Sequence, residues 1–188
     1  MKEVIVNLFN QNILTATSIN TQFEFLKRHY RKVNANILVI GCSNGYKSLF
    51  FEKQSYNVTS IDSSKDNTIL FKENVNKDCI ISSYDSYIPD TALDIIWVDD
   101  AFTYESREDI LNYLNHFATI IKPDGLIYCN FKFGNDYYVD GKLYTSFTLI
   151  DFSEFIKQSQ FQMVDCLVTK DERPSRDEGW LHLLLRRK

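Results

Sequence analysis

Asn36-Ile-Leu-Val-Ile-Gly-Cys-Ser-Asn-Gly45 is the stretch of this sequence that decides the fold. A short, wholly apolar run, Ile37–Ile40, ends in a Gly-x-x-x-Gly pattern, and a helix-compatible segment follows from Tyr46. Asp62 then ends a second candidate strand, 57–61. Strand, glycine turn, helix, strand and acid in this order are typical of a nucleotide site in an open α/β sheet. The glycines allow a close approach of the backbone, and the acid accepts hydrogen bonds from ribose hydroxyls.

Segments with strand and helix periodicity alternate along the remaining chain. This alternation predicts an α/β fold, with a doubly wound, Rossmann-like, mostly parallel sheet of seven strands and helices on both faces. The last two strands lack an intervening helix, so we expect an antiparallel C-terminal edge strand. Lys122-Pro-Asp-Gly125 predicts a stop and turn, and a loop with Gly134 and Gly141 precedes the last helix. The expected strands are 37–40, 57–61, 79–82, 93–98, 126–131, 161–168 and 180–187, and the expected helices are about 18–33, 46–54, 65–76, 105–121 and 149–159.

The length and composition fit one globular domain. The chain has 188 residues, of which 44% are hydrophobic and 24% charged, so we expect a single domain over 1–188 with a sizeable core. Residues 1–35 are interpreted as a helical lead-in or lid, and 36–188 as the Rossmann-like core. No apolar run reaches the roughly 20 residues that span a bilayer, and the N-terminus lacks a signal-peptide pattern. We therefore expect a cytoplasmic protein without a membrane partner.

The charge pattern gives no strong nucleic-acid signal. The formal net charge is −4, which argues against a globally basic binding surface. The basic cluster Lys27–Lys32 is interpreted as the solvated end of a helix, where cations favour the negative pole of the macrodipole. Contact with a phosphate or an acidic substrate is the alternative interpretation of this cluster.

The cysteines and histidines show no metal-binding spacing. Because no Cys-x-x-Cys pair exists, we expect the cysteines to be buried thiols in a reducing compartment, and we expect no metal site. These residues are Cys42, Cys79, Cys129 and Cys166, and His29, His116 and His182.

Several segments together resemble the class I S-adenosylmethionine (SAM)-dependent methyltransferases. Leu38–Gly45 resembles the glycine-rich first motif of that family, and Asp62 resembles the acid after its second strand. Ser83–Ser86 resembles the segment whose aspartate contacts adenine, and Ile121–Leu126 resembles the turn before the fifth strand. The C-terminal half resembles a narrower set of small bacterial methyltransferase-like proteins. The residues that match this set are Lys132–Gly134, Asp171–Arg173 and Trp180–Leu181.

The resemblance implies SAM as cofactor and S-adenosylhomocysteine (SAH) as product. It assigns Asp62 to the ribose, with a plain helix cap as the alternative, and Asp85 to the adenine amino group, with a loop turn as the alternative. The cofactor-binding residues that it implies are Gly41, Cys42, Ser43, Gly45, Asp62, Ser63, Asp85, Ser86 and Asp99.

Candidate acceptor-side residues follow the later strands, at the edge of the sheet where ligands bind. Asp99 and Asp100 are adjacent, so at most one should face the pocket, and we favour Asp100 as a base over a solvated loop acid. Tyr104 is a candidate for positioning the acceptor, with packing as the alternative. Lys132 is a candidate catalytic residue and, with Arg173, a candidate site for an anionic acceptor. The alternative for this pair is neutralisation of nearby acids.

Trp180 is predicted either to line the acceptor site or to fill the core. Two departures from the family pattern matter for the cofactor. Val39 stands where the first motif usually has an acid that helps hold the methionine end of SAM, and Ser43 stands at the second glycine. These departures leave two functions open. The first is a methyltransferase with an unidentified, small-molecule acceptor, and the second is a non-catalytic module that binds SAM or SAH.

A nicotinamide-dependent oxidoreductase is disfavoured, because the third glycine of Gly-x-Gly-x-x-Gly is missing after Gly45. We expect a monomer or a homodimer. The acceptor itself, and the atom that is methylated, do not follow from the sequence.

Overall fold

The apolar run before the glycine loop forms a central strand, β2 (Asn36–Ile40), in the computed structural model, which describes residues 13–14, 19–170 and 179–188. β2 pairs in parallel with β3 (Asn57–Asp62) on one side and with β5 (Leu93–Val98) on the other. β5 in turn pairs in parallel with β6 (Ile121–Phe133). Four of the five residues of β2 are buried, as expected for a strand covered on both faces.

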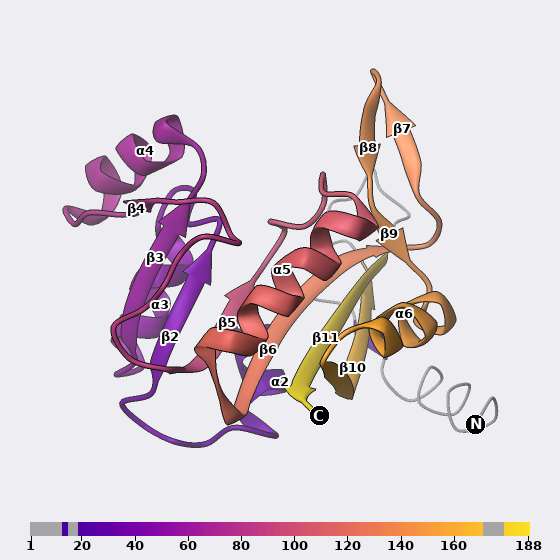
Figure 1. The fold of residues 1–188 in the computed structure, drawn as a ribbon. Coiled ribbons are helices and arrows are strands. Elements are labelled where there is room, and N and C mark those ends of the chain that lie inside the picture. Colours follow the sequence, from indigo (N-terminus) through magenta and orange to yellow (C-terminus); the bar gives the residue numbers. More distant parts are fainter. Residues whose placement is uncertain (1–12, 15–18, 171–178) are drawn as a thin grey trace.

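The full sheet confirms the predicted fold. Its strand order is β1-β10-β11-β6-β5-β2-β3-β4, with β9 paired to β6 (Figure 1). The sheet has nine strands instead of seven, because two short strands that the sequence did not predict, β1 and β9, extend it. β11 is antiparallel to both of its neighbours, β10 and β6, and β10 in turn lies between β11 and β1. The remaining strands of this sheet are β1 (Ile13–Leu14), β4 (Ile80–Ile81), β9 (Ser146–Phe147), β10 (Phe161–Lys170) and β11 (Gly179–Arg187).

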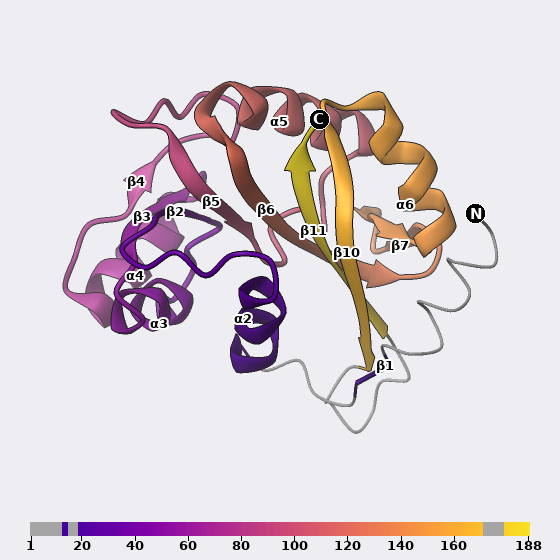
Figure 2. The ribbon, with the colours of Figure 1, turned by 90° about the horizontal axis from the view of Figure 1, so that it is seen from below.

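Helices cover both faces of the sheet, as predicted. Figure 2 shows α5 and α6 on one face and α2 and α3 on the other. Three helices begin at a side-chain cap that accepts a backbone hydrogen bond, namely Ser64, Ser106 and Thr148. The helices are α2 (Ile19–Lys27), α3 (Tyr46–Lys53), α4 (Lys65–Val75), α5 (Arg107–Ile120) and α6 (Leu149–Phe155), followed by the 3₁₀ turn η1 (Ile156–Gln158).

Each face of the sheet has its own apolar core. One core joins α5 and α6 to the sheet, and Phe102, Phe117 and Phe131 lie at its centre. The other joins α2 and α3 to the sheet, where the rings of Trp97 and Tyr128 stack with centroids 3.8 Å apart. These two cores hold the carboxyl ends of β2, β3, β5 and β6 side by side, which fixes the edge where a ligand site is expected.

Two local predictions differ from the structure. The Lys122–Gly125 segment ends a helix, as expected, but it belongs to β6 as an irregularity in the pairing with β5 instead of forming a separate turn. The loop predicted around Gly134 and Gly141 contains a hairpin, β7 (Tyr137–Val139) and β8 (Lys142–Tyr144). Gly141, with a φ of +76°, forms the hairpin turn, so the turn glycine was visible while its flanking strands were too short to predict.

The amino end of β5 is fixed by a buried carboxylate, Asp94. Burial alone would raise the pKa of Asp94, but its four hydrogen bonds hold the pKa well below its usual range. Most of the basic cluster is exposed, as interpreted, and Lys32, whose side chain is 57% exposed, also reaches this carboxylate, because the chain turns back towards the sheet after α2. The groups bound to Asp94 are Tyr30 Oη (2.7 Å), Lys32 Nζ (2.9 Å), Asn36 N (2.9 Å) and Lys122 Nζ (2.8 Å).

Candidate functional site

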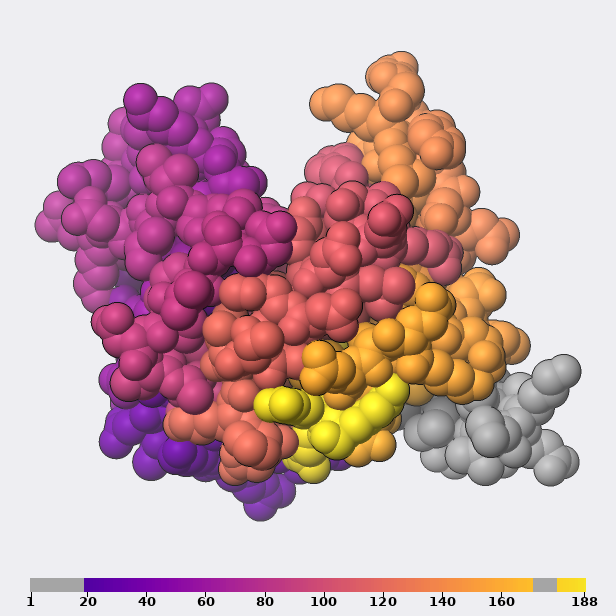
Figure 3. Space-filling model, in the orientation of Figure 1, coloured from indigo at the N-terminus to yellow at the C-terminus, as the bar shows by residue number. Residues whose placement is uncertain are grey.

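The molecular surface is hollowed above the carboxyl ends of the central strands. Figure 3 shows this hollow between the lobe that carries α4 and the projecting hairpin β7–β8. The glycine loop, residues 41–45, joins β2 to α3. Gly45 has a φ of +80°, and a Cβ added to it would lie 2.1 Å from Val75 Cγ2, so the turn into α3 requires glycine. Gly41 also has a positive φ, +72°, where the chain leaves β2.

Asp62 lies at the end of β3, as predicted, but its carboxylate is bound by the protein itself. It accepts hydrogen bonds from Ser43 N (3.3 Å), Ser64 N (2.9 Å) and the side chain of Asn67 (3.1 Å to each oxygen). Only 2% of Asp62 is exposed, whereas its neighbour Ser63 is exposed. In this arrangement Asp62 joins the glycine loop to the start of α4 and thereby shapes the loop.

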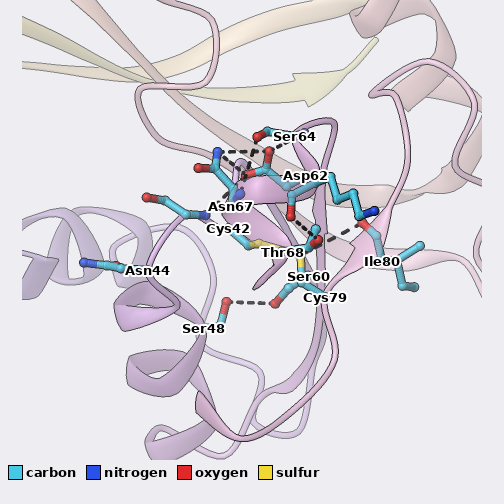
Figure 4. Close-up of a disulfide and its surroundings, with 12 residues drawn as sticks. Cys42, Asn44, Ser48, Ser60, Asp62, Ser64, Asn67, Thr68, Cys79 and Ile80 are labelled. Atoms are coloured by element: carbon cyan, nitrogen blue, oxygen red, sulfur yellow. Dashed lines mark hydrogen bonds between the residues drawn. A yellow bond between two sulfur atoms is a disulfide. The ribbon is translucent and has the colours of Figure 1, made fainter. Parts of the chain in front are cut away.

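Two of the four cysteines are not free thiols, which corrects the prediction. The structure joins Cys42 of the glycine loop to Cys79, just before β4, in a disulfide (Figure 4). Sequence spacing concealed this contact, because 37 residues separate the two cysteines and only the parallel packing of β2, β3 and β4 brings them together. Cys129 and Cys166 are buried, as expected.

The segment predicted to face adenine, Asp85 and Ser86, is exposed on the loop after β4. Ser86 is held by the Ser83 hydroxyl at 2.6 Å. The residue that sequence reasoning missed here is Tyr84. It is buried near Gly41, and burial together with the charge of Asp62 raises its pKa to about 12.

The prediction for Asp99 and Asp100 was wrong in one respect, since both residues line the same cavity. Strand alternation was the premise, but the chain leaves the extended conformation at Asp100, which has a φ of +64°. The Asp100 N–H donates to Asn130 Oδ1 at 2.8 Å. The same Asn130 donates through Nδ2 to Asp99 Oδ1 at 2.5 Å, and Asp99 Oδ2 forms an ion pair with Lys47 Nζ.

We call this space the Asp99 cavity. Its volume is about 300 Å³, and α2, the start of α3 and the ends of β5, β6 and β11 enclose it. Gln22 of α2 is buried here, with 6% of its surface exposed, and its Oε1 has no hydrogen-bond partner among the residues that the structure describes. The lining residues are Ile19, Gln22, Tyr46, Lys47, Asp99, Asp100, Asn130 and Trp180.

Lys47, Gln22 and Asn130 are the polar members of this cavity that sequence reasoning did not single out. A lysine in the first turn of the helix after a glycine loop is a signal that could have identified Lys47. No local signal marks Gln22 or Asn130, because their side chains reach the cavity from elements far away in sequence.

Lys132 and Trp180 lie opposite each other on β6 and β11, with Lys132 Nζ 4.2 Å from the centre of the indole ring. Trp180 lines the Asp99 cavity and is only half-buried, so it is not a core residue. Asp136, one of the nearby acids in the alternative interpretation of Lys132, binds Arg107 and Ser146 N. Arg173 lies outside the described residues.

Tyr104 belongs to an aromatic cluster beside Asp100. Its ring packs edge-on against Tyr144 at 4.9 Å, and Tyr144 stacks on Tyr137 at 4.8 Å. The hydrogen bond with Tyr144 raises the pKa of Tyr104. Tyr104 is 59% exposed, so this cluster presents aromatic surface to solvent.

Within residues 13–14, 19–170 and 179–188, no helix has the length and apolar character required to cross a bilayer. Over the same ranges, no three His, Cys, Asp or Glu side chains gather into a metal-binding group.

Comparison with known proteins finds a methyltransferase domain over about half of the chain and methyltransferase folds over most of it. Residues 38–129 match the family model described as a methyltransferase domain. No curated protein matches the sequence. A Burkholderia thailandensis 1,6-didemethyltoxoflavin N1-methyltransferase, solved with SAH, superposes with a TM-score of 0.77 at 17% identity over 89% of this chain and 77% of that chain.

Two further solved structures are similar. A glycopeptide N-methyltransferase complexed with SAH has a TM-score of 0.74 at 9% identity, covering 92% of this chain and 91% of that one. A SAM-dependent methyltransferase from Methanosarcina mazei has a TM-score of 0.73 at 14% identity, covering 92% and 99%. At these identities the likeness establishes the fold, and it does not favour the alternative, a non-catalytic module that binds SAM or SAH.

Proposed function

We propose that this protein, whose residues 38–129 are a methyltransferase domain within a class I SAM-dependent methyltransferase fold, transfers a methyl group from SAM to a small-molecule acceptor. The match of residues 38–129 to the methyltransferase-domain model supports the enzyme class, and the shared fold with methyltransferases that bind SAH supports SAM as the cofactor. The acceptor class is the step that we add. One observation carries it: the Asp99 cavity adjoins the glycine loop and opens beside exposed aromatic side chains.

The residues at the glycine loop fit SAM on structural grounds. Gly41 follows β2 with a φ of +72°, and a Cβ there would lie 3.0 Å from Ala101 Cβ. A side chain is therefore disfavoured at this position, and a ligand can approach the backbone of the loop closely. In the adjoining cavity, the buried acceptor Gln22 Oε1 has no hydrogen-bond donor among the described residues, so a ligand can supply one. We propose that the loop, Ser63 and the segment of Asp85 and Ser86 hold the cofactor. For Asp62 we propose a supporting role through the loop, with contact to the ribose requiring Asn67 to turn away.

The acceptor side is proposed to consist of aromatic and charged side chains. The Tyr104 cluster offers a flat surface on which a small planar molecule stacks favourably. Trp180 lines the Asp99 cavity and Lys132 Nζ lies over its indole ring, and we propose that this pair receives an anionic or polar acceptor. Arg173 stays a predicted member of this acceptor site. The net charge of −4 disfavours a nucleic-acid acceptor.

Bound SAM would supply an activated methyl group, so the protein mainly aligns the reactants. We propose that Asp100, exposed at the rim of the Asp99 cavity, takes the proton from an acceptor hydroxyl or amine. Tyr104 and Lys132 would orient that acceptor, and Trp180 would exclude water from it. We further propose that residues 1–188 act as one domain in the cytoplasm, as a monomer or homodimer.

Titration calorimetry with SAM and SAH, followed by transfer of a radiolabelled methyl group to a panel of small aromatic hydroxyl and amine compounds, tests the proposal. We expect micromolar binding of both ligands and label in at least one small compound. NAD serves as the negative control. A folded protein that binds neither SAM nor SAH would refute the enzyme assignment, and label found only in added protein or RNA would refute the acceptor class.

A further inference from the structure

We infer that the Lys47–Asp99 ion pair, together with Gln22 and Asn130, is a receptor for an α-amino acid, and that it binds the methionine end of SAM. The inference rests on the proposed function and deepens it. It assigns a role to three residues outside the sequence motifs, and it explains how the chain can do without an acid at Val39.

The acid missing from the first motif is supplied by the neighbouring strand. Val39 is buried in the core between the sheet and α2 and α3, so a carboxylate there would lie among apolar side chains. In the parallel register, Ile40 of β2 pairs with Val98 of β5. The next residue of β5 is Asp99, which therefore ends its strand beside Gly41, next to the glycine loop.

Asp99 is built to hold a positive charge. Its side chain is 5% exposed, and Asn130 Nδ2 fixes one carboxylate oxygen at 2.5 Å. The other oxygen faces Lys47 Nζ. A buried carboxylate needs a cation or several donors, so this oxygen keeps a partner in every state of the site.

Lys47 is the mobile half of the pair. Its side chain is 29% exposed and extends from the first turn of α3, so the ammonium can move within the cavity. When a ligand separates Lys47 from Asp99, each of the two side chains therefore gains a new partner of opposite charge. A ligand ammonium takes the place beside Asp99, and Lys47 turns to the ligand carboxylate.

Gln22 provides the observation that points to a bound donor. Its Oε1 is buried in the cavity wall without a partner among the described residues, and such an acceptor is unfavourable unless a donor reaches it. An ammonium group has three N–H donors. Asp99 Oδ2 and Gln22 Oε1 are two acceptors for them, and Lys47 is the cation for the carboxylate. A cavity that offers acceptors to an ammonium group and a cation to a carboxylate is suited to a zwitterion, the form in which an α-amino acid exists near neutral pH.

The test compares ligands with and without the amino-acid end. SAM, SAH and 5′-methylthioadenosine, which lacks that end, are titrated calorimetrically into the wild type and into Lys47→Met, Gln22→Leu and Lys53→Met. Lys53 is an exposed lysine on the same helix, so it is the matched control.

We expect Lys47→Met to lower the affinity for SAM and SAH about tenfold to a hundredfold, because the variant loses a charge-assisted contact to the ligand carboxylate. The affinity for 5′-methylthioadenosine should not change. Gln22→Leu should weaken SAM and SAH several-fold, and Lys53→Met should change nothing. Equal weakening of all three ligands, or wild-type binding of 5′-methylthioadenosine as tight as that of SAH, would overturn the inference and leave the proposed function standing. Absence of all binding by the folded wild type would overturn both.

Discussion

Strand β5 has a buried carboxylate at each end, and the protein treats the two in opposite ways. At the amino end, Asp94 is bound by four groups from the described chain and adjoins no cavity of the site. At the carboxyl end, Asp99 has one amide and one lysine as partners, and it lines a cavity of about 300 Å³. The two residues are equally buried, with 2% and 6% of their surfaces exposed.

The difference shows that burial alone does not identify a functional acid. Asp94 joins the chain after α2, the start of β2 and the start of β6, so its bonds stabilise the fold. Asp99 is held by residues that also face a cavity, and the nearby Gln22 lacks a partner. In an open α/β sheet the carboxyl edge is where ligands bind, so the amino edge is free to be cross-linked.

The largest expected effect comes from removing the Asp94 carboxylate near the amino end of β5. Asp94→Ala should lower the free energy of unfolding by about 3–5 kcal/mol, because it leaves partly buried Lys122 and buried Tyr30 without their acceptor. Urea denaturation measures the loss, and SAM affinity of the folded fraction should be unchanged. Asp124→Ala, which removes an exposed acid on β6, is the control. A loss below about 1 kcal/mol would contradict the structural role of Asp94.

As the pH falls, the protein should first lose the stability that depends on neutral His182, and only at lower pH the stability that depends on Asp94. His182, which bonds Tyr128 and Thr169 below the Asp99 cavity, is buried, and burial lowers its pKa to about 4. The unfolded chain binds this proton near pH 6.5, so stability falls between about pH 6.5 and 4, by about 3 kcal/mol in all. The depressed pKa of Asp94 places its own loss below about pH 4.

Urea denaturation at several pH values follows this loss. His182→Gln keeps a hydrogen-bonding side chain without the titration, so its stability should be nearly constant over the same interval. An equally steep decline in the variant would assign the acid sensitivity to other groups.

Breaking the carboxyl end should give the opposite pattern to Asp94→Ala. Asp99→Asn keeps the shape and the bond to Asn130 while removing the charge that faces Lys47. We expect SAM affinity to fall about tenfold to a hundredfold, which corresponds to about 1.4–2.8 kcal/mol, with little change in unfolding. Calorimetry and urea denaturation of the same sample separate the two effects. If the variant is destabilised but binds SAM with normal affinity, Asp99 stabilises the fold, as Asp94 does, and does not bind the ligand.

The smallest expected effect is in the aromatic cluster of Tyr104. Tyr104→Phe removes the hydroxyl that bonds Tyr144 and keeps the ring, so unfolding should change by less than about 1 kcal/mol and SAM affinity should not change. The KM of the acceptor found in the labelling assay should rise a few-fold. Tyr138→Phe, on the exposed tip of the hairpin, is the control. A weakened SAM affinity in Tyr104→Phe would move this tyrosine to the cofactor side.

Much of the candidate site could be read from the sequence, because each part ends a strand. Gly41 and Gly45 lie where the chain must turn sharply, and Asp62 and Asp99 come at the ends of predicted strands, so their place at one edge of the sheet follows from parallel pairing. What failed was the orientation of side chains. Alternation along β5 predicted that one of Asp99 and Asp100 faces away, and the positive φ of Asp100 invalidates that argument.

The sequence by itself determined the order and type of the main helices and strands, and therefore the doubly wound sheet, because apolar periodicity records which face of each local segment is buried. Only the tertiary structure decided which distant residues meet: Lys47 with Asp99, Cys42 with Cys79, and Lys32 with Asp94. The physical reason is that periodicity is a local property of burial. Hydrogen bonds and ion pairs depend instead on strand order, on register and on single backbone angles, which packing across the whole sheet sets.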